Sequence, residues 1–104
     1  MVNKEDMLIR IVRMTFKAEE VGSFLEVFNE SKNKIRGFEG CQHLELHRDY
    51  NQDNIFSTYS HWVDEQALNN YRQSELFNEV WAKTKVLFAD KPMAFSSKQY
   101  IIVE

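Results

Sequence analysis

At the centre of the chain, residues 40–62 read GCQHLELHRDYNQDNIFSTYSHW. Apolar and polar residues alternate at 40–49 and again at 55–62, and this period of two predicts strands. The segment 50–54 between them is polar and rich in Asn and Asp, which favours a turn. These residues therefore predict a β-hairpin at the middle of the fold.

The flanking sequence extends this pattern in both directions. Residues 7–16 are rich in β-branched and other apolar residues, which predicts a strand. Residues 18–36 carry apolar side chains at helical spacing. After the hairpin, Asp64 and Ser74 are suitable N-caps for two further helical segments. These are expected at about 65–72 and 75–88, and a last strand is expected at 93–103.

The resulting order, β-α-β-β-α-β, predicts an α+β fold of the ferredoxin-like type. We expect one domain over residues 1–104, with a core at about 7–103, and a four-stranded antiparallel sheet with its helices on one face. Several strands are also apolar on their other face. Because a large uncovered apolar face indicates a partner, we expect a homodimer packed through the sheet faces.

The composition excludes several classes of protein. The 104 residues include 13 Lys and Arg against 16 Asp and Glu, a net charge of −3 that argues against nucleic acid as a partner. No apolar run approaches the ~20 residues of a membrane span. The N-terminus has no signal-peptide pattern, and the single Cys41 fits a reducing compartment, so a cytoplasmic protein is expected.

Aromatic side chains are numerous for a chain of this size. There are 8 Phe, 4 Tyr and 2 Trp among 104 residues, and only 3 Gly and 1 Pro. A small domain has little interior in which to bury so many rings. Some of them are therefore expected to line a cavity or a partner surface.

Four segments form a distinctive set: Leu-Glu-Leu-His-Arg-Asp at 44–49, Tyr-Ser-His-Trp at 59–62, Val-Asp-Glu-Gln-Ala-Leu-Asn-Asn-Tyr at 63–71 and Ser-Glu-Leu-Phe at 74–77. Together they resemble the antibiotic biosynthesis monooxygenase family of dimeric α/β barrels. The resemblance extends over about residues 7–100. It implies the ferredoxin-like fold and a dimer. It leaves the reaction open, since the family includes quinone-forming oxygenases, haem-degrading oxygenases and an isomerase of a phosphorylated sugar.

The haem-degrading branch of the family is a poor match. Its strand Asn falls near Val12, its helix Trp at Tyr71 and its iron-ligating His at Trp81. An indole offers only an N–H donor and cannot ligate iron. Haem degradation by that mechanism is therefore disfavoured.

The quinone-forming branch matches at one position. Its strand-end Trp corresponds to Trp62, whereas its Asn, Tyr and Arg positions hold Thr58, Leu68 and a residue near Ala82. Tyr71 lies one helical turn beyond Leu68 and is a hypothetical substitute for the family Tyr. We therefore expect Trp62 and Tyr71 to be catalytic. The substrate pocket is expected between sheet and helices, with Thr58 and Ser60 as polar contacts and Phe77 and Trp81 as further walls. The alternative is that both tryptophans are ordinary core residues.

The three histidines are candidates for other roles. His43 and His47 are four residues apart on one strand, about 13 Å, which disfavours a shared metal ion. No metal site is expected. These histidines are expected to form hydrogen bonds at the dimer face or its rim. One of them could still act as a general base, because His titrates near neutrality; His43 is the first candidate and His61 the second.

Three other side chains have open roles. Arg10 and Arg13 fall on opposite faces of the first strand, where one could hold an anionic substrate. The favoured alternative is an interfacial salt bridge with Glu45 or a C-terminal acid. Cys41 has no assigned activating partner, so a nucleophilic role is disfavoured.

The expected function is a cofactor-independent monooxygenase acting on a small aromatic or quinol compound. Phosphate-binding, redox-thiol and zinc-protease motifs are lacking in the sequence, so no cofactor is expected. The substrate itself would form the carbanion that reacts with oxygen. The alternatives are a non-catalytic small-molecule-binding barrel of the stress-response kind and an isomerase of a small carbonyl compound.

Overall fold

A computed structural model describes residues 6–104. Its elements follow the expected order: β1 Leu8–Thr15, a 3₁₀ turn Ala18–Glu20, α1 Val21–Arg36, β2 Cys41–Arg48, β3 Ile55–Trp62, α2 Glu65–Arg72, α3 Glu75–Lys85 and β4 Met93–Ser97. The two expected caps are confirmed. Asp64 accepts a hydrogen bond from the Ala67 amide at 2.8 Å, and Ser74 accepts one from Phe77 at 3.1 Å.

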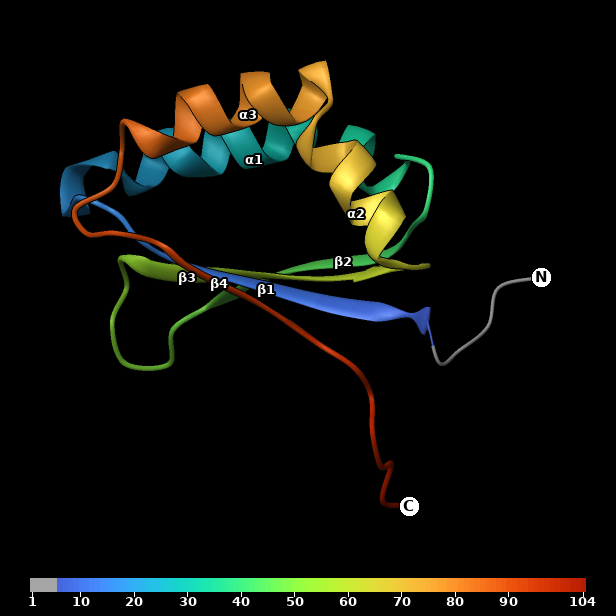
Figure 1. The fold of residues 1–104 in the computed structure, drawn as a ribbon. Helices are drawn as coiled ribbons and strands as arrows, with labels where there is room; N and C mark the ends of the chain where they lie inside the picture. The colour runs from blue at the N-terminus through green and yellow to red at the C-terminus, as the bar shows by residue number, and fades with distance from the viewer. Residues whose placement is uncertain (1–5) are drawn as a thin grey trace.

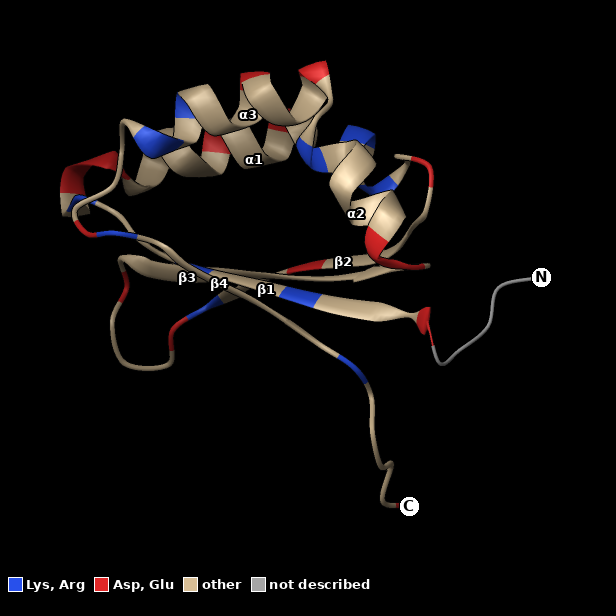
Figure 2. Cartoon of the chain, viewed as in Figure 1, with Lys and Arg blue, Asp and Glu red and all other residues tan. Residues whose placement is uncertain are grey.

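The four strands form one antiparallel sheet in the order β2-β3-β1-β4. All three α-helices lie over one face of this sheet, and the sheet is open rather than closed into a barrel (Figure 1). The predicted α+β, ferredoxin-like fold is confirmed. Acidic and basic residues are interspersed over the helices and loops (Figure 2). Within residues 6–104, no helix combines the length and hydrophobicity needed to cross a membrane.

The predicted last strand, 93–103, is too long. β4 ends at Ser97, which pairs with Ile9, so the chain beyond it soon passes the first residue of β1 and, within residues 6–104, pairs with no strand. The segment after β4 runs away from the sheet (Figure 1). Its apolar residues are exposed: Tyr100 93%, Ile101 74%, Ile102 62% and Val103 89%. Their β propensity predicts a strand, but the described residues offer this segment no neighbouring strand for backbone hydrogen bonds.

The predicted helix 75–88 is also too long. α3 ends at Lys85, and Leu87 and Phe88 turn back toward the sheet, where Phe88 bridges Phe16. Leu87 is buried there. Burial of these two side chains against β1 explains why the chain leaves the helix before its apolar pattern ends.

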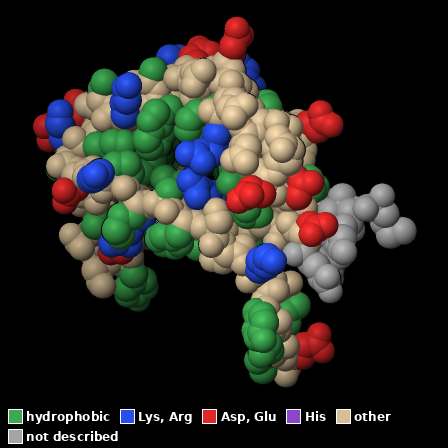
Figure 3. Space-filling model, viewed as in Figure 1, with side chains coloured by type: hydrophobic (Ala, Val, Ile, Leu, Met, Phe, Trp, Pro, Cys, Tyr) green, Lys and Arg blue, Asp and Glu red, His purple; other side chains and the backbone are tan. Residues whose placement is uncertain are grey.

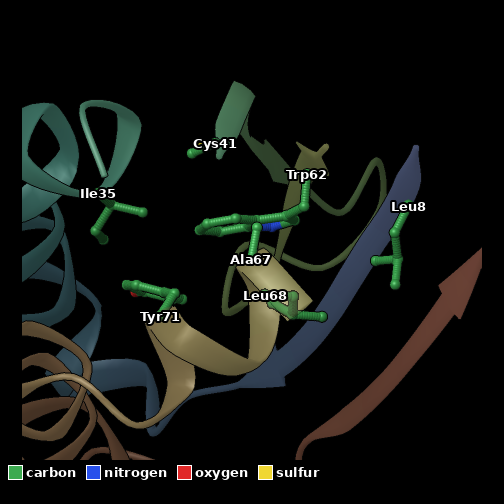
Figure 4. Close-up of a cluster of buried hydrophobic side chains, with 7 residues drawn as sticks. All are labelled: Leu8, Ile35, Cys41, Trp62, Ala67, Leu68 and Tyr71. Atoms are coloured by element: carbon green, nitrogen blue, oxygen red, sulfur yellow. The ribbon is translucent and has the colours of Figure 1, made fainter. Parts of the chain in front are cut away.

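The core between helices and sheet has two parts. The Phe16 cluster contains the buried side chains Met14, Phe16, Phe24, Phe56 and Leu87. The Trp62 cluster contains Leu8, Ile35, Cys41, Trp62, Ala67, Leu68 and Tyr71 (Figure 4). Phe16 is fully buried and stacks on Phe24 with ring centroids 4.1 Å apart.

Gly40 holds the start of β2 against α2. Its φ of +90° lies in the left-handed region, and a Cβ built there would be 2.4 Å from the Cβ of Ala67. Only glycine meets both conditions. The Gly40 carbonyl also accepts a hydrogen bond from the Val63 amide at 2.9 Å, directly after Trp62. This close approach therefore fixes the end of β3.

Candidate functional site

A cavity of about 320 Å³ lies between the helices and the sheet. Its volume is within the range of small-molecule sites. Figure 3 shows a hollow lined with hydrophobic side chains and bordered by Lys or Arg side chains. The lining includes residues from both core clusters, from β1, β3 and β4, and from α1, α2 and α3.

The sheet supplies the floor of this cavity through two rows of paired residues. One row across the strands is Leu44, Ser60, Arg10 and Ser96, and the next is Leu46, Thr58, Val12 and Ala94. Six of these side chains line the cavity: Arg10, Val12, Leu44, Thr58, Ser60 and Ala94. Most of them are small or polar, which leaves space above the sheet.

Trp62 is held rigidly at one end of the cavity. It is 1% exposed, and its indole Nε1–H donates to the Ser60 hydroxyl at 3.0 Å. The Ser60 hydroxyl in turn donates to the Arg10 carbonyl at 3.5 Å. The indole stacks on the Tyr71 ring with centroids 5.0 Å apart and planes inclined by 24° (Figure 4). Ser60 thus positions Trp62, because its hydroxyl is already engaged.

Tyr71 lies on α2 beside the indole. Its ring contacts Phe38 and Phe77 edge-on, at centroid distances of 5.4 and 5.2 Å. Burial, with a smaller contribution from Cys41, raises the pKa of the Tyr71 hydroxyl well above its ordinary value. The phenol is therefore neutral, and it is suited to donating a hydrogen bond rather than to acting as a base.

The helices supply the opposite wall through a second pair of stacked rings. Phe77 and Trp81 on α3 have centroids 5.8 Å apart and planes inclined by 11°. Trp81 also meets Phe88 edge-on at 5.5 Å. The predicted pocket residues are therefore together in one cavity: Thr58, Ser60, Trp62, Tyr71, Phe77 and Trp81. Their roles in binding or catalysis stay predictions.

The structure does not bring His43 to this cavity. It lies on the open face, by which we mean the sheet face away from the helices, and its imidazole contacts the Glu45 carboxylate. His47 contacts the other oxygen of that carboxylate at 2.8 Å. These two contacts, that of His47 first, lower the pKa of Glu45. His43 and His47 therefore share a carboxylate, and neither reaches the predicted pocket.

His61, the second candidate base, also lies on the open face. Its Nε2 is 3.0 Å from the Tyr59 hydroxyl, and its ring centroid is 4.9 Å from that of His43. Burial, and then repulsion from His43, lower its pKa. Among residues 6–104, no group of three or more His, Cys, Asp or Glu side chains is placed to hold a metal ion.

The two arginines of β1 have separate environments. Arg13 is on the open face and pairs with Asp49 of the same chain at 3.4 Å. The predicted salt bridge across a dimer interface stays a prediction. Arg10 lines the cavity, and its Nη1 donates to the Ser96 hydroxyl at 3.1 Å. Of the two, only Arg10 is therefore placed to meet a molecule in the cavity.

The sequence reasoning missed Arg72. This side chain lines the cavity from the last turn of α2, one residue beyond Tyr71. Its spacing from Leu68 places both residues on one helix face, because positions four apart are neighbours on a helix. That spacing was the available signal. Cys41, in contrast, is buried, and burial raises the pKa of its thiol, which disfavours a reactive thiolate.

The sequence model of the antibiotic biosynthesis monooxygenase family matches residues 7–83. The chain belongs to this family. The family resemblance of the central hairpin and of the Trp62–Phe77 segment is thereby confirmed. None of the curated proteins matches the sequence significantly.

Solved structures share the fold at low sequence identity. A conserved protein from Methanosarcina mazei Go1 superposes with a TM-score of 0.86 at 18% identity, covering 93% of this chain and 97% of that one. An antibiotic biosynthesis monooxygenase superposes with a TM-score of 0.85 at 19% identity, covering 90% and 99%. A protein from Pseudomonas aeruginosa gives 0.83 at 17%, covering 95% and 99%. These likenesses establish the fold alone.

Proposed function

We propose that this protein is a cofactor-independent monooxygenase that converts a small aromatic or quinol compound into a quinone. The observation that carries the proposal is the cavity in which Trp62 stacks on Tyr71 and Phe77 stacks on Trp81. Rings held in this way accept another flat ring by stacking. Membership of a family named for monooxygenases supports the choice of reaction.

In the proposed reaction the substrate supplies its own electrons. A ring CH₂ group loses a proton to water, the carbanion transfers electrons to O₂, and a carbon–oxygen bond forms as the peroxide takes a proton back from water. Loss of water then leaves a carbonyl group, so that CH₂ and O₂ become C=O and H₂O. The protein would bind, orient and desolvate the reacting carbon, and the neutral Tyr71 hydroxyl would donate to the developing oxyanion.

Oxygen consumption tests this proposal directly. With anthrone as substrate, we expect the wild type to take up O₂ faster than a buffer control. Trp62→Phe and Tyr71→Phe should lower kcat by roughly 10-fold to 1,000-fold, the cost of removing an oriented ring or an oxyanion donor. Tyr50→Phe is the matched control, because Tyr50 is 99% exposed and does not line the cavity. Unchanged turnover in both cavity variants would exclude these residues as the site.

A non-catalytic binding protein is the second candidate function. Among the residues that line the cavity in the described chain, the titratable ones are Arg10, Tyr71 and Arg72, and no imidazole or carboxylate is present to act as a base. This observation favours binding without turnover. Saturable binding of anthrone without O₂ uptake would establish this alternative in place of the oxygenase.

The proposed working unit is a homodimer packed through the open faces of two sheets. Ile11, Tyr59, Glu45 and Phe95 form one row across this face, and Phe95 is 47% exposed. The apolar members of this row, Ile11, Tyr59 and Phe95, are costly to expose to water and would be covered when a second copy packs on them. Sedimentation equilibrium at micromolar concentration should give twice the chain mass. Tyr59→Glu should shift it toward the monomer, and a wild-type monomer would contradict the proposal.

A further inference from the structure

Two positive charges stand at the edge of an otherwise apolar cavity. Arg10 rises from the floor on β1, and Arg72 approaches from α2. Within residues 6–104, neither guanidinium has a carboxylate within 4.0 Å, whereas Arg13 on the open face is paired with Asp49. The cavity therefore carries cationic groups that the described chain leaves without counter-charge.

The two charges also act on each other. Burial lowers the pKa of Arg10, and repulsion from Arg72 lowers it further. Like charges near an apolar wall raise the free energy of the empty cavity, and an anion between them relieves the repulsion. The arrangement thus favours an anionic ligand on electrostatic grounds.

The Arg10 side chain is positioned by a neighbouring residue of the sheet. Its guanidinium donates to Ser96 on β4 at 3.1 Å, which leaves its other N–H groups free to turn toward the cavity. Its carbonyl accepts the hydrogen bond from Ser60, the residue that also holds the Trp62 indole. Ser60 therefore ties the Trp62 indole to the backbone of the residue that carries the cation, and the guanidinium itself is held by Ser96.

We propose that Arg10 and Arg72 form the anion-binding end of the cavity, and that its ligand is a planar aromatic compound carrying an anionic oxygen, either a carboxylate or a phenolate. The proposal rests on the proposed function, since the stacked rings bind the aromatic part. A guanidinium matches the planar, two-oxygen geometry of a carboxylate and also binds a phenolate oxygen. In an oxygenase, the same pair would stabilise the ionised substrate where no lining side chain can take its proton.

The decisive comparison uses two probes of nearly the same shape. Isothermal calorimetry would measure binding of 2-naphthoate and of neutral 2-naphthamide to the purified full-length protein. We expect naphthoate to bind roughly 10-fold to 100-fold more tightly, the usual value of hydrogen bonds to a charged group. A second measurement follows the absorption of 4-nitrophenol, whose pKa should fall when it is bound.

The two probes also distinguish the two kinds of anion. Preference for naphthoate alone would assign a carboxylate, and a lowered nitrophenol pKa alone would assign a phenolate. If naphthoate binds no more tightly than naphthamide and nitrophenol keeps its pKa, the proposal is wrong. In that case the proposed oxygenase would still stand or fall by O₂ uptake with anthrone, which is neutral as supplied.

Charge-removing variants then test the two residues. Arg72→Gln, at an exposed position on α2, should abolish the preference for the anion by weakening naphthoate binding far more than naphthamide binding, and Arg72→Lys should restore part of the preference. Arg10→Gln should do the same, with Arg10→Lys as the conservative variant in case the strand tolerates glutamine poorly. Lys85→Gln removes the same unit of charge from an exposed position outside the cavity lining and should have no effect. Retention of the preference in both glutamine variants would contradict the assignment.

Discussion

The two faces of the sheet carry rings in contrasting ways. On the helix-covered face, Trp62 and Phe16 are buried, at 1% and 0% exposure, and pack on other apolar rings. On the open face, the imidazoles of His43 and His47 contact the Glu45 carboxylate at half-exposed positions. The alternation of a strand places these two kinds of ring one residue apart.

The two faces therefore contribute to the free energy of unfolding in different ways, one independent of pH and the other dependent on it. The helix-covered face obtains its free energy from apolar burial, which is insensitive to pH. On the open face, burial lowers the pKa of His61, so the contribution of this side chain to stability depends on pH. The cavity between helices and sheet receives its positive charges from Arg10 on the covered face of the sheet and from Arg72 on α2. Variants on each face should therefore differ in the size and in the kind of their effect.

Removal of the central ring of the covered face should have the largest effect. Phe16→Ala should lower the free energy of unfolding by about 3–5 kcal/mol, since a fully buried ring leaves a cavity behind. Phe95→Ala on the open face is the matched control and should cost less, because Phe95 is 47% exposed. Urea denaturation measures both. Equal losses would contradict the assignment of the core to the covered face.

Gly40→Ala should come next, at about 2–4 kcal/mol, because it combines an unfavourable φ with a contact against Ala67. Gly22→Ala on α1 is the control with the opposite sign. No atom lies within 4 Å of its Cβ position, and alanine should stabilise the helix by about 0.4–1 kcal/mol. In thermal denaturation, Tm should therefore fall for Gly40→Ala and rise for Gly22→Ala.

Ser60→Ala should cost about 1–3 kcal/mol, because it leaves the buried Trp62 N–H without an acceptor. In the Trp62→Phe background the same substitution should cost less, since the donor is already gone. A double-mutant cycle with urea denaturation measures this coupling. Additive losses would show that the hydrogen bond between Ser60 and Trp62 contributes nothing to the free energy of unfolding.

The smallest effect is expected on the open face, at His61. Its pKa is lowered in the folded state, so the unfolded chain binds the proton more readily. The contribution of His61 is thus complete above the ordinary His pKa of about 6.5 and is lost as the pH falls through the folded value. The stability of the wild type relative to His61→Gln should decrease on acidification below about pH 6.5. An increase would contradict the direction of the shift.

The predictable part of the site was the part governed by periodicity. Helical spacing identified Tyr71, Phe77 and Trp81 as inward-facing, and strand alternation put Thr58, Ser60 and Trp62 on one face. Alternation also separated His43 from Leu44, but it does not tell which of two faces the helices cover. The position of His43 outside the pocket, on the open face, is therefore determined by where the helices pack and not by the strand pattern.

The misplaced features depend on contacts rather than on local pattern. Arg72 resembles any solvated arginine at a helix end, and only the cavity beside it gives it a role. The apolar run Tyr100–Val103 has the composition of a strand, yet a strand needs a partner, and β1 begins at Leu8. Such partners are set by the whole fold and are not encoded within the segment itself.

The placement of the two tryptophans has a practical consequence. They are the only two indoles among the 104 residues, and both line the same cavity. Tryptophan emission, excited at a wavelength that tyrosine does not absorb, therefore reports on this site. Trp81→Phe would leave the emission of the buried, hydrogen-bonded Trp62, and a quinone formed beside it would quench that emission. The protein thus contains its own optical sensor for whatever enters the cavity.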